Sequence, residues 1–128
     1  MSATVEANTL AAFNDSIRQS LPQIVSTLRI RLGAKLVAYI ANVSETRAVR
    51  EWSEGERTPA PTTARRLRLA FHVATLIDTS EGDGVAATWF QGMNPQLGDR
   101  SPARVLREDS TEEAMSQVLN AAKSFVGA

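Results

Sequence analysis

The chain has 128 residues, of which 43% are hydrophobic, and this is enough for one compact domain or for two small helical units that share a core. It contains no cysteine, which excludes disulfide bonds, thiolate zinc sites and cysteine nucleophiles. No apolar run approaches the roughly 20 residues of a membrane span, and residues 1–15 lack a secretory signal pattern, so we expect a cytoplasmic protein with no membrane partner.

The formal net charge is zero, but the charges are unevenly distributed along the chain. Residues 1–70 contain 10 Lys and Arg against 6 Asp and Glu, whereas residues 71–128 contain 4 against 8. Because salt confines charge effects to roughly 10 Å, the first half could attract a polyanion that the second half would repel. A difference of a few charges also arises on ordinary solvated surfaces, so charge alone does not establish a polyanion partner.

Apolar residues recur with helical spacing along the chain, and no run alternates as a strand would. We therefore predict an all-α fold with an N-terminal helix near residues 7–20, a group of helices over 22–79 and a smaller helical unit over 84–128. We assign no role to residues 1–21. The apolar stripes consist of Ile24, Leu28, Leu32, Leu36 and Ile40, then Leu67, Ala70, Ala74 and Ile77, and finally Met115, Val118, Leu119, Ala122 and Phe125.

Three serines stand where helices are predicted to begin. Ser44 precedes ETRAVREWSE, Ser101 precedes Pro102, and Ser110 stands at capping-box spacing from Glu113. We expect each serine to accept a hydrogen bond from the first turn of the helix that follows it.

Residues 33–55, GAKLVAYIANVSETRAVREWSEG, predict two helices joined by a tight turn. One face of the second helix is apolar and consists of Ala48, Val49 and Trp52. The opposite side is polar and carries Thr46, Arg47 and Arg50. Burial of the apolar face would project the polar side away from the domain.

In their order along the chain, these residues resemble the Xre-type helix-turn-helix, whose pattern is alanine, glycine-valine-serine, valine, tryptophan and glycine. The matching residues are Ala38, Asn42, Val43, Ser44, Val49, Trp52 and Gly55. Asn42 stands where the family usually has glycine, and asparagine is the residue that, after glycine, best tolerates positive φ.

A second stretch, WFQGMNPQLGDRSPARVLRE at residues 89–108, resembles the C-terminal unit of the MbcA/ParS antitoxin family. The shared features are an aromatic helix end, asparagine-proline, leucine-glycine, an arginine, and serine-proline opening a short helix. The two resemblances together cover about residues 30–127 and leave residues 1–20 uncovered.

The resemblance implies the antitoxin of a type II toxin-antitoxin system. Residues 22–79 would bind operator DNA and autorepress, and residues 84–128 would neutralise a RES-domain toxin that consumes NAD, covering its NAD pocket with the C-terminal segment. The residues that this assigns to the toxin are Asn120, Lys123, Ser124, Phe125, Val126, Gly127 and Ala128.

The residues expected at DNA are Lys35, Ser44, Thr46, Arg47, Arg50 and Arg57. Arg47 and Arg50 are candidates to contact bases or phosphates, while the others would hold phosphates. The alternative for the two arginines is pairing with Glu51 and Glu54 at i,i+4, and such exposed pairs contribute only about 0.3–0.5 kcal/mol.

A homodimer is expected because two-fold operators are read by two-fold proteins, and either the 7–20 helix or the C-terminal unit could provide the contact. Two other functions stay open: an orphan Xre-type regulator without a toxin, and an inhibitor module that has lost DNA binding. We expect no enzyme, cofactor or metal, because a single histidine and scattered carboxylates form no catalytic or ligand set.

Four other residues are not assigned to a site. Arg65, Arg66 and Arg68 should form the solvated face of their helix. His72 should lie on the surface or between helices.

Overall fold

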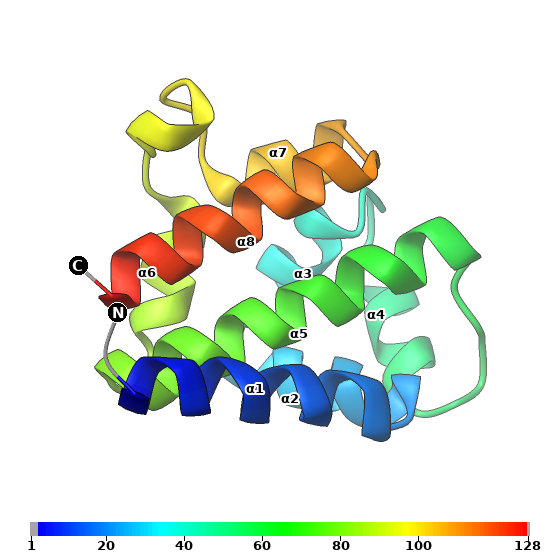
Figure 1. The fold of residues 1–128 in the computed structure, drawn as a ribbon. Helices are drawn as coiled ribbons and strands as arrows, with labels where there is room; N and C mark the ends of the chain where they lie inside the picture. The colour runs from blue at the N-terminus through cyan, green and yellow to red at the C-terminus, as the bar shows by residue number, and fades with distance from the viewer. Residues whose placement is uncertain (1–2, 128) are drawn as a thin grey trace.

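The computed structural model describes residues 3–127 and has an all-α fold, as predicted (Figure 1). Within this range there are eight α-helices, one 3₁₀ helix and no strand. They are α1 (Ala3–Arg18), α2 (Leu21–Leu32), α3 (Ala34–Ile40), α4 (Thr46–Ser53), α5 (Pro61–Glu81), α6 (Val85–Gln91), the 3₁₀ helix η1 (Pro95–Leu97), α7 (Pro102–Glu108) and α8 (Glu112–Gly127). The first helix begins at Ala3, earlier than the sequence pattern indicated.

The longest helix, α5, crosses the middle of the molecule and packs against α1, α2, α3, α6 and α8. Figure 1 shows α8 along one side of it and α1 along the other. The predicted stripe of Leu67, Ala70, Ala74 and Ile77 is buried. So are Phe71, Val73 and Leu76, because α5 has neighbours on several sides.

One hydrophobic core extends through both predicted units. It joins Val49 and Trp52 of α4 to Phe90 of α6, Leu106 of α7 and Val118 of α8. Residues 84–128 therefore share their core with residues 22–79 and do not form a separate one.

Of the three predicted caps, only that of Ser101 is correct. Its Oγ accepts a hydrogen bond from the backbone N–H of Arg104 at 3.1 Å. The residue that caps α4 is Glu45, without a side-chain hydrogen bond, because the helix begins at Thr46, one residue too late for Ser44.

The cap predicted at Ser110 is also wrong, because α8 begins at Glu112. The hydroxyl of Thr111 accepts the hydrogen bond from the N–H of Ala114 at 3.2 Å instead. Asp109 in turn accepts one from the N–H of Thr111 at 2.9 Å, and hydrogen bonds with the backbone and the side chain of Thr111 hold the pKa of Asp109 below its usual value.

Two of the three arginines predicted to be solvated are structural. Arg66 is buried, which lowers its pKa, while Asp109 acts in the opposite direction. Arg68 donates from Nη1 to the carbonyls of Ser16 (2.8 Å) and Gln19 (3.2 Å), which satisfies the C-terminal end of α1. Only Arg65 is exposed as predicted.

A buried carboxylate connects three helices near the end of α5. Asp78, whose side chain is 1% exposed, accepts hydrogen bonds from the N–H of Ala86 and from Nη1 of Arg31, both at 2.9 Å. The helix α6 has no side-chain hydrogen bond from its own N-cap residue. Asp78, eight positions earlier in the chain than Ala86, accepts a hydrogen bond from one of the first N–H groups of α6 instead.

His72 lies between helices, which is one of the two positions predicted for it. It is 6% exposed, and its ring makes an edge-to-face contact with Phe13 at 5.9 Å between centroids. Burial lowers the pKa of His72, Lys123 lowers it further, and a hydrogen bond with the backbone of Thr9 opposes both effects.

Among the helices formed by residues 3–127, none combines the length and the apolar character needed to cross a bilayer.

Replacing Asp78 by alanine is expected to lower the free energy of unfolding by about 2–3 kcal/mol, because the N–H of Ala86 and the guanidinium of Arg31 would lose a buried acceptor. Urea unfolding followed by circular dichroism measures the change. Asp83→Ala is the matched control: this fully exposed carboxylate lies 3.9 Å from the same arginine, and its loss should leave the midpoint unchanged. Equal effects of both variants would contradict the assignment.

Acidification should destabilise the protein through His72. Its folded pKa lies below the unfolded value of about 6.5, so between these two values the unfolded chain binds more protons. The contribution of His72 is therefore complete above about pH 6.5 and is lost as the pH falls through the folded pKa. Urea unfolding between about pH 7.5 and about pH 5 should show a smaller loss of stability for His72→Gln than for the wild type. Parallel pH profiles would disprove this role.

Candidate nucleic-acid interface

The connection between α3 and α4 is a tight turn. The N–H of Val43 donates to the carbonyl of Ala38 at 3.0 Å, and Asn42 between them has φ 59°. This left-handed conformation is the one in which asparagine substitutes best for glycine. Five residues separate the end of α3 from the start of α4, and the chain changes direction within them.

The inner face of α4 is anchored as predicted. Val49 is completely buried, and Trp52 and Ala48 are 3% and 8% exposed. These side chains pack α4 against α2 and α3. Rotation of α4 about its axis would expose the indole of Trp52, so packing determines which residues face outward.

The outer side of α4 presents both predicted arginines. The side chain of Arg47 is 70% exposed and lies 3.6 Å from Glu51, whereas Arg50 is 47% exposed and donates to Glu54 at 3.1 Å. Both i,i+4 pairs that the sequence offered as the alternative to DNA contact are thus formed. Since exposed pairs contribute only about 0.3–0.5 kcal/mol, they can open when a stronger anion approaches.

Acidic residues accompany the arginines on this surface. Glu51 lies 3.7 Å from Arg57 as well as near Arg47. A hydrogen bond with Glu54 and its charge raise the pKa of the exposed Glu56. The surface is therefore mixed in charge, and a polyanion would have to displace these carboxylates from the arginines.

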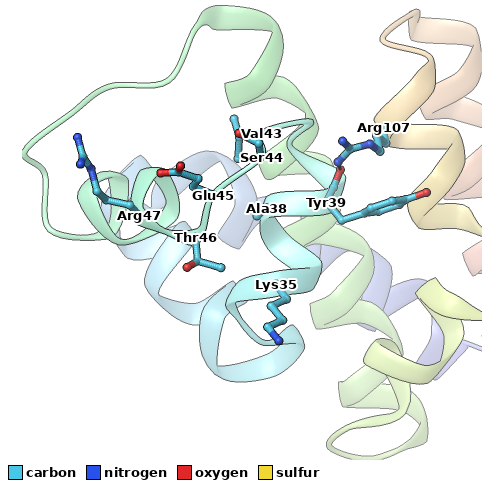
Figure 2. A pocket seen from close by; sticks show the side chains of 9 residues that line it. All are labelled: Lys35, Ala38, Tyr39, Val43, Ser44, Glu45, Thr46, Arg47 and Arg107. Atoms are coloured by element: carbon cyan, nitrogen blue, oxygen red, sulfur yellow. Dashed lines mark hydrogen bonds between the residues drawn. The ribbon is translucent and has the colours of Figure 1, made fainter.

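An open groove of about 640 Å³ lies between α3, the start of α4 and α7 (Figure 2). Three cationic side chains from these three helices border it: Lys35, Arg47 and Arg107. Figure 2 shows them spaced around the groove, with Thr46 at the start of α4 between Arg47 and Lys35. The N-terminus of α4 has no side-chain cap, so its first N–H groups add partial positive charge there.

Arg107 is the cationic residue of this groove that the sequence did not indicate. Its Nη1 donates to the carbonyl of Tyr39 at 2.9 Å, and its guanidinium lies 4.6 Å from the centre of the Tyr39 ring (Figure 2). These contacts hold the guanidinium in place at the end of α3. Arg107 is 68 positions from Tyr39 in the sequence, and no local pattern signals a contact over that separation.

A second hollow of about 390 Å³ adjoins the first and shares the lining residues Val43, Ser44, Glu45 and Arg47 with it. It brings Arg57 together with Ser44 and Arg47. Of the residues predicted at DNA, five line one or both hollows: Lys35, Ser44, Thr46, Arg47 and Arg57. Arg50 lines neither hollow and projects from the next turn of α4.

The residues predicted to contact a toxin lie on the last turns of α8, which stays helical to Gly127. Asn120, Ser124, Phe125 and Gly127 are exposed, Lys123 and Val126 are half-buried, and Ala128 lies outside the described residues. Phe125 is 41% exposed, and its ring centre lies 6.4 Å from that of Trp89 in α6. The segment is thus a helix end with an exposed aromatic ring.

Comparison of the chain with models of known families, with curated proteins and with solved structures found no match.

Proposed function

We propose that this protein is a DNA-binding regulator in which α3 and α4 form a helix-turn-helix and α4 is the recognition helix. The observation that carries the proposal is the orientation of α4: Val49 and Trp52 are buried on one side, and Arg47 and Arg50 project from the other. The resemblance of residues 33–55 to the Xre-type motif supports the same function. A DNA target would place the protein in the cytoplasm.

The dimensions of α4 suit a major groove. An α-helix with its side chains is about 10–12 Å in diameter, and the major groove of B-DNA is about 12 Å wide. Arg47 in the first turn would reach base edges, and Arg50 would lie one turn further along. The uncapped N–H groups of α4 and the side chain of Thr46 would approach a phosphate.

The cations around the hollows would position the protein on the backbone. Lys35 borders the first hollow and Arg57 the second, and Arg107 adds a third point on α7. Because the ring and carbonyl of Tyr39 already hold Arg107, less side-chain entropy would be lost when it binds a phosphate.

Replacing Arg47 or Arg50 by alanine should weaken binding to the promoter upstream of this chain's own gene by about 1–3 kcal/mol, and replacing both should abolish it.

Arg107→Ala should weaken binding equally on promoter and random duplexes. It should also lower the slope of log binding constant against log salt concentration by about 1, as expected for the loss of one phosphate contact. Fluorescence anisotropy at several salt concentrations measures both.

Arg104→Ala is the matched control for Arg107, because Arg104 lies on the same helix, pairs with Glu108 at 2.9 Å and does not line either hollow. Its loss should leave DNA affinity unchanged. If the wild type binds no duplex, the regulator proposal is wrong, and an inhibitor module without DNA affinity becomes the better description. If the wild type binds and Arg47→Ala and Arg50→Ala bind as tightly, α4 is not the recognition helix.

As a second function, we propose that the end of α8 neutralises a RES-domain toxin. This is the antitoxin role that the resemblance of the sequence implies. The exposed ring of Phe125, whose centre lies 6.4 Å from that of Trp89, favours a partner at this position because aromatic side chains contribute strongly to binding at protein interfaces. The resemblance of residues 89–108 to the antitoxin family points to the kind of partner.

Phe125→Glu should release the toxicity of a RES-domain protein encoded beside this chain, because a carboxylate would have to be desolvated at the contact. Cell survival and NAD level on co-expression are the measurements, and promoter binding should be retained. Ser116→Glu is the control, since this exposed residue lies on the first half of α8. Survival with Phe125→Glu would contradict the assignment, and absence of such a neighbour would favour the orphan regulator.

A further inference from the structure

The helix α1 leaves its large apolar side chains largely exposed, although the ring of Phe13 also contacts the buried His72. The residues that it buries, Ala12 and Ser16, are small. In contrast, Leu10 is 60% exposed, Phe13 47% and Ile17 61%. Their spacing of three and four residues places them in one stripe along the helix.

Polar contacts prevent α1 from rotating this stripe inward. Nδ2 of Asn8 donates to the hydroxyl of Ser80 at 3.3 Å, and Arg68 donates to the carbonyls of Ser16 and Gln19. A rotation that buried Leu10 or Ile17 would break these hydrogen bonds and leave a guanidinium without its carbonyl partners.

The stripe continues into an apolar groove of about 510 Å³ between α1, α5 and α8. Glu6, Leu10 and Phe13 are among the residues that line it from α1, with Leu119 and Lys123 from α8 and His72 from α5. The same surface therefore offers both a ridge and a hollow, and such a surface can be complementary to itself.

We infer that this surface is a dimer interface at which α1 packs antiparallel against α1 of a second copy. In a two-fold contact the same patch serves both chains, so its residues must match in reverse order. With the axis next to Phe13, Leu10 of each copy lies opposite Ile17 of the other, and the two Phe13 rings lie close together. The spacing of the stripe satisfies this requirement.

The charges on α1 match the same arrangement. Glu6 lies toward the N-terminal end and Arg18 at the C-terminal end, and both are exposed. In the antiparallel pair, the end of α1 that carries Glu6 lies beside the end of the other helix that carries Arg18, so opposite charges share each end of the contact. Antiparallel helix dipoles also attract, whereas a parallel pair would bring like charges together.

A standard interface buries roughly 800 Å² of surface per partner, and one helix with its groove offers less surface than that. We therefore expect a weak dimer that exchanges with monomer. The interface lies on α1, α5 and α8 and uses no residue of the α3–α4 connection. The residues of the two surfaces are therefore separate, and a variant in the DNA-binding surface leaves the dimer interface intact.

Sedimentation equilibrium of the full chain over a concentration series tests the inference. The double variant Leu10→Glu/Ile17→Glu should raise the dimer dissociation constant at least about tenfold, because it places carboxylates opposite each other. Both residues are largely exposed, and an unchanged circular dichroism spectrum would verify the fold. Ile30→Glu is the matched control, since Ile30 on α2 is 87% exposed and lies outside the stripe and its groove.

The absence of cysteine from the chain allows a second measurement. Phe13→Cys should form a disulfide-linked dimer under mild oxidation, and a mixture of Leu10→Cys and Ile17→Cys should form the mixed dimer in preference to either self-linked one. Ile30→Cys should stay monomeric. A wild type that is monomeric throughout the series, a double variant that dimerises as well as the wild type, or equal cross-linking at Ile30 would each overturn the inference.

A third variant separates the two proposals. Arg47→Ala should dimerise like the wild type whether or not it binds DNA. If it dimerises but the wild type fails to bind any duplex, the regulator proposal falls and the interface stands.

Discussion

The architecture depends on the burial of α5 on several sides at once. Leu67, Val73 and Ile77 are completely buried because α1, α2, α3, α6 and α8 all pack against this helix. The helix α4 is held mainly by α2 and α3 rather than by α5, so it stays at the periphery with one face available. A single central helix thus orders the core and leaves a short amphipathic helix outside it.

The groove beside α4 is lined by residues from both of the units that the sequence predicted, 22–79 and 84–128. Arg107 belongs to the C-terminal segment, yet its hydrogen bond and its ring contact are with Tyr39 at the end of α3. The core is also continuous from Trp52 to Phe90 and Val118. A partner that displaced α7 would therefore disturb the α3–α4 surface, so the two proposed functions would share structural elements.

Local pattern was sufficient for features determined within a few turns of chain. The all-α fold, the buried face of α4 and the i,i+4 pairs of Arg47 and Arg50 follow from helical periodicity, which acts over three or four residues. The cap at Ser101 follows for the same reason. Ser44 and Ser110 were misassigned as caps because a shift of one or two residues in a helix start changes the capping residue.

Features that depend on distant segments could not be read from the same pattern. Arg66 and Arg68 stand in a row that is typical of a solvated face, but one is buried and the other satisfies the end of α1. Arg107 joined the candidate site only because α7 packs on α3. Many residues separate the two partners of each of these contacts. Helical periodicity is compatible with many ways of packing such distant helices together, so it does not predict which residues meet.

By itself, the sequence determined which face of α4 would be apolar, because the positions of Val49 and Trp52 on a helix follow from its geometry. Only the tertiary structure decided that α1 would bury Ala12 and Ser16 and expose Leu10, Phe13 and Ile17. An amphipathic stripe specifies that a helix has an apolar face. Whether that face meets the core or the solvent depends on which of its sides the rest of the molecule contacts, and here close packing on α5 with hydrogen bonds from Asn8 and Arg68 selected the small-residue side.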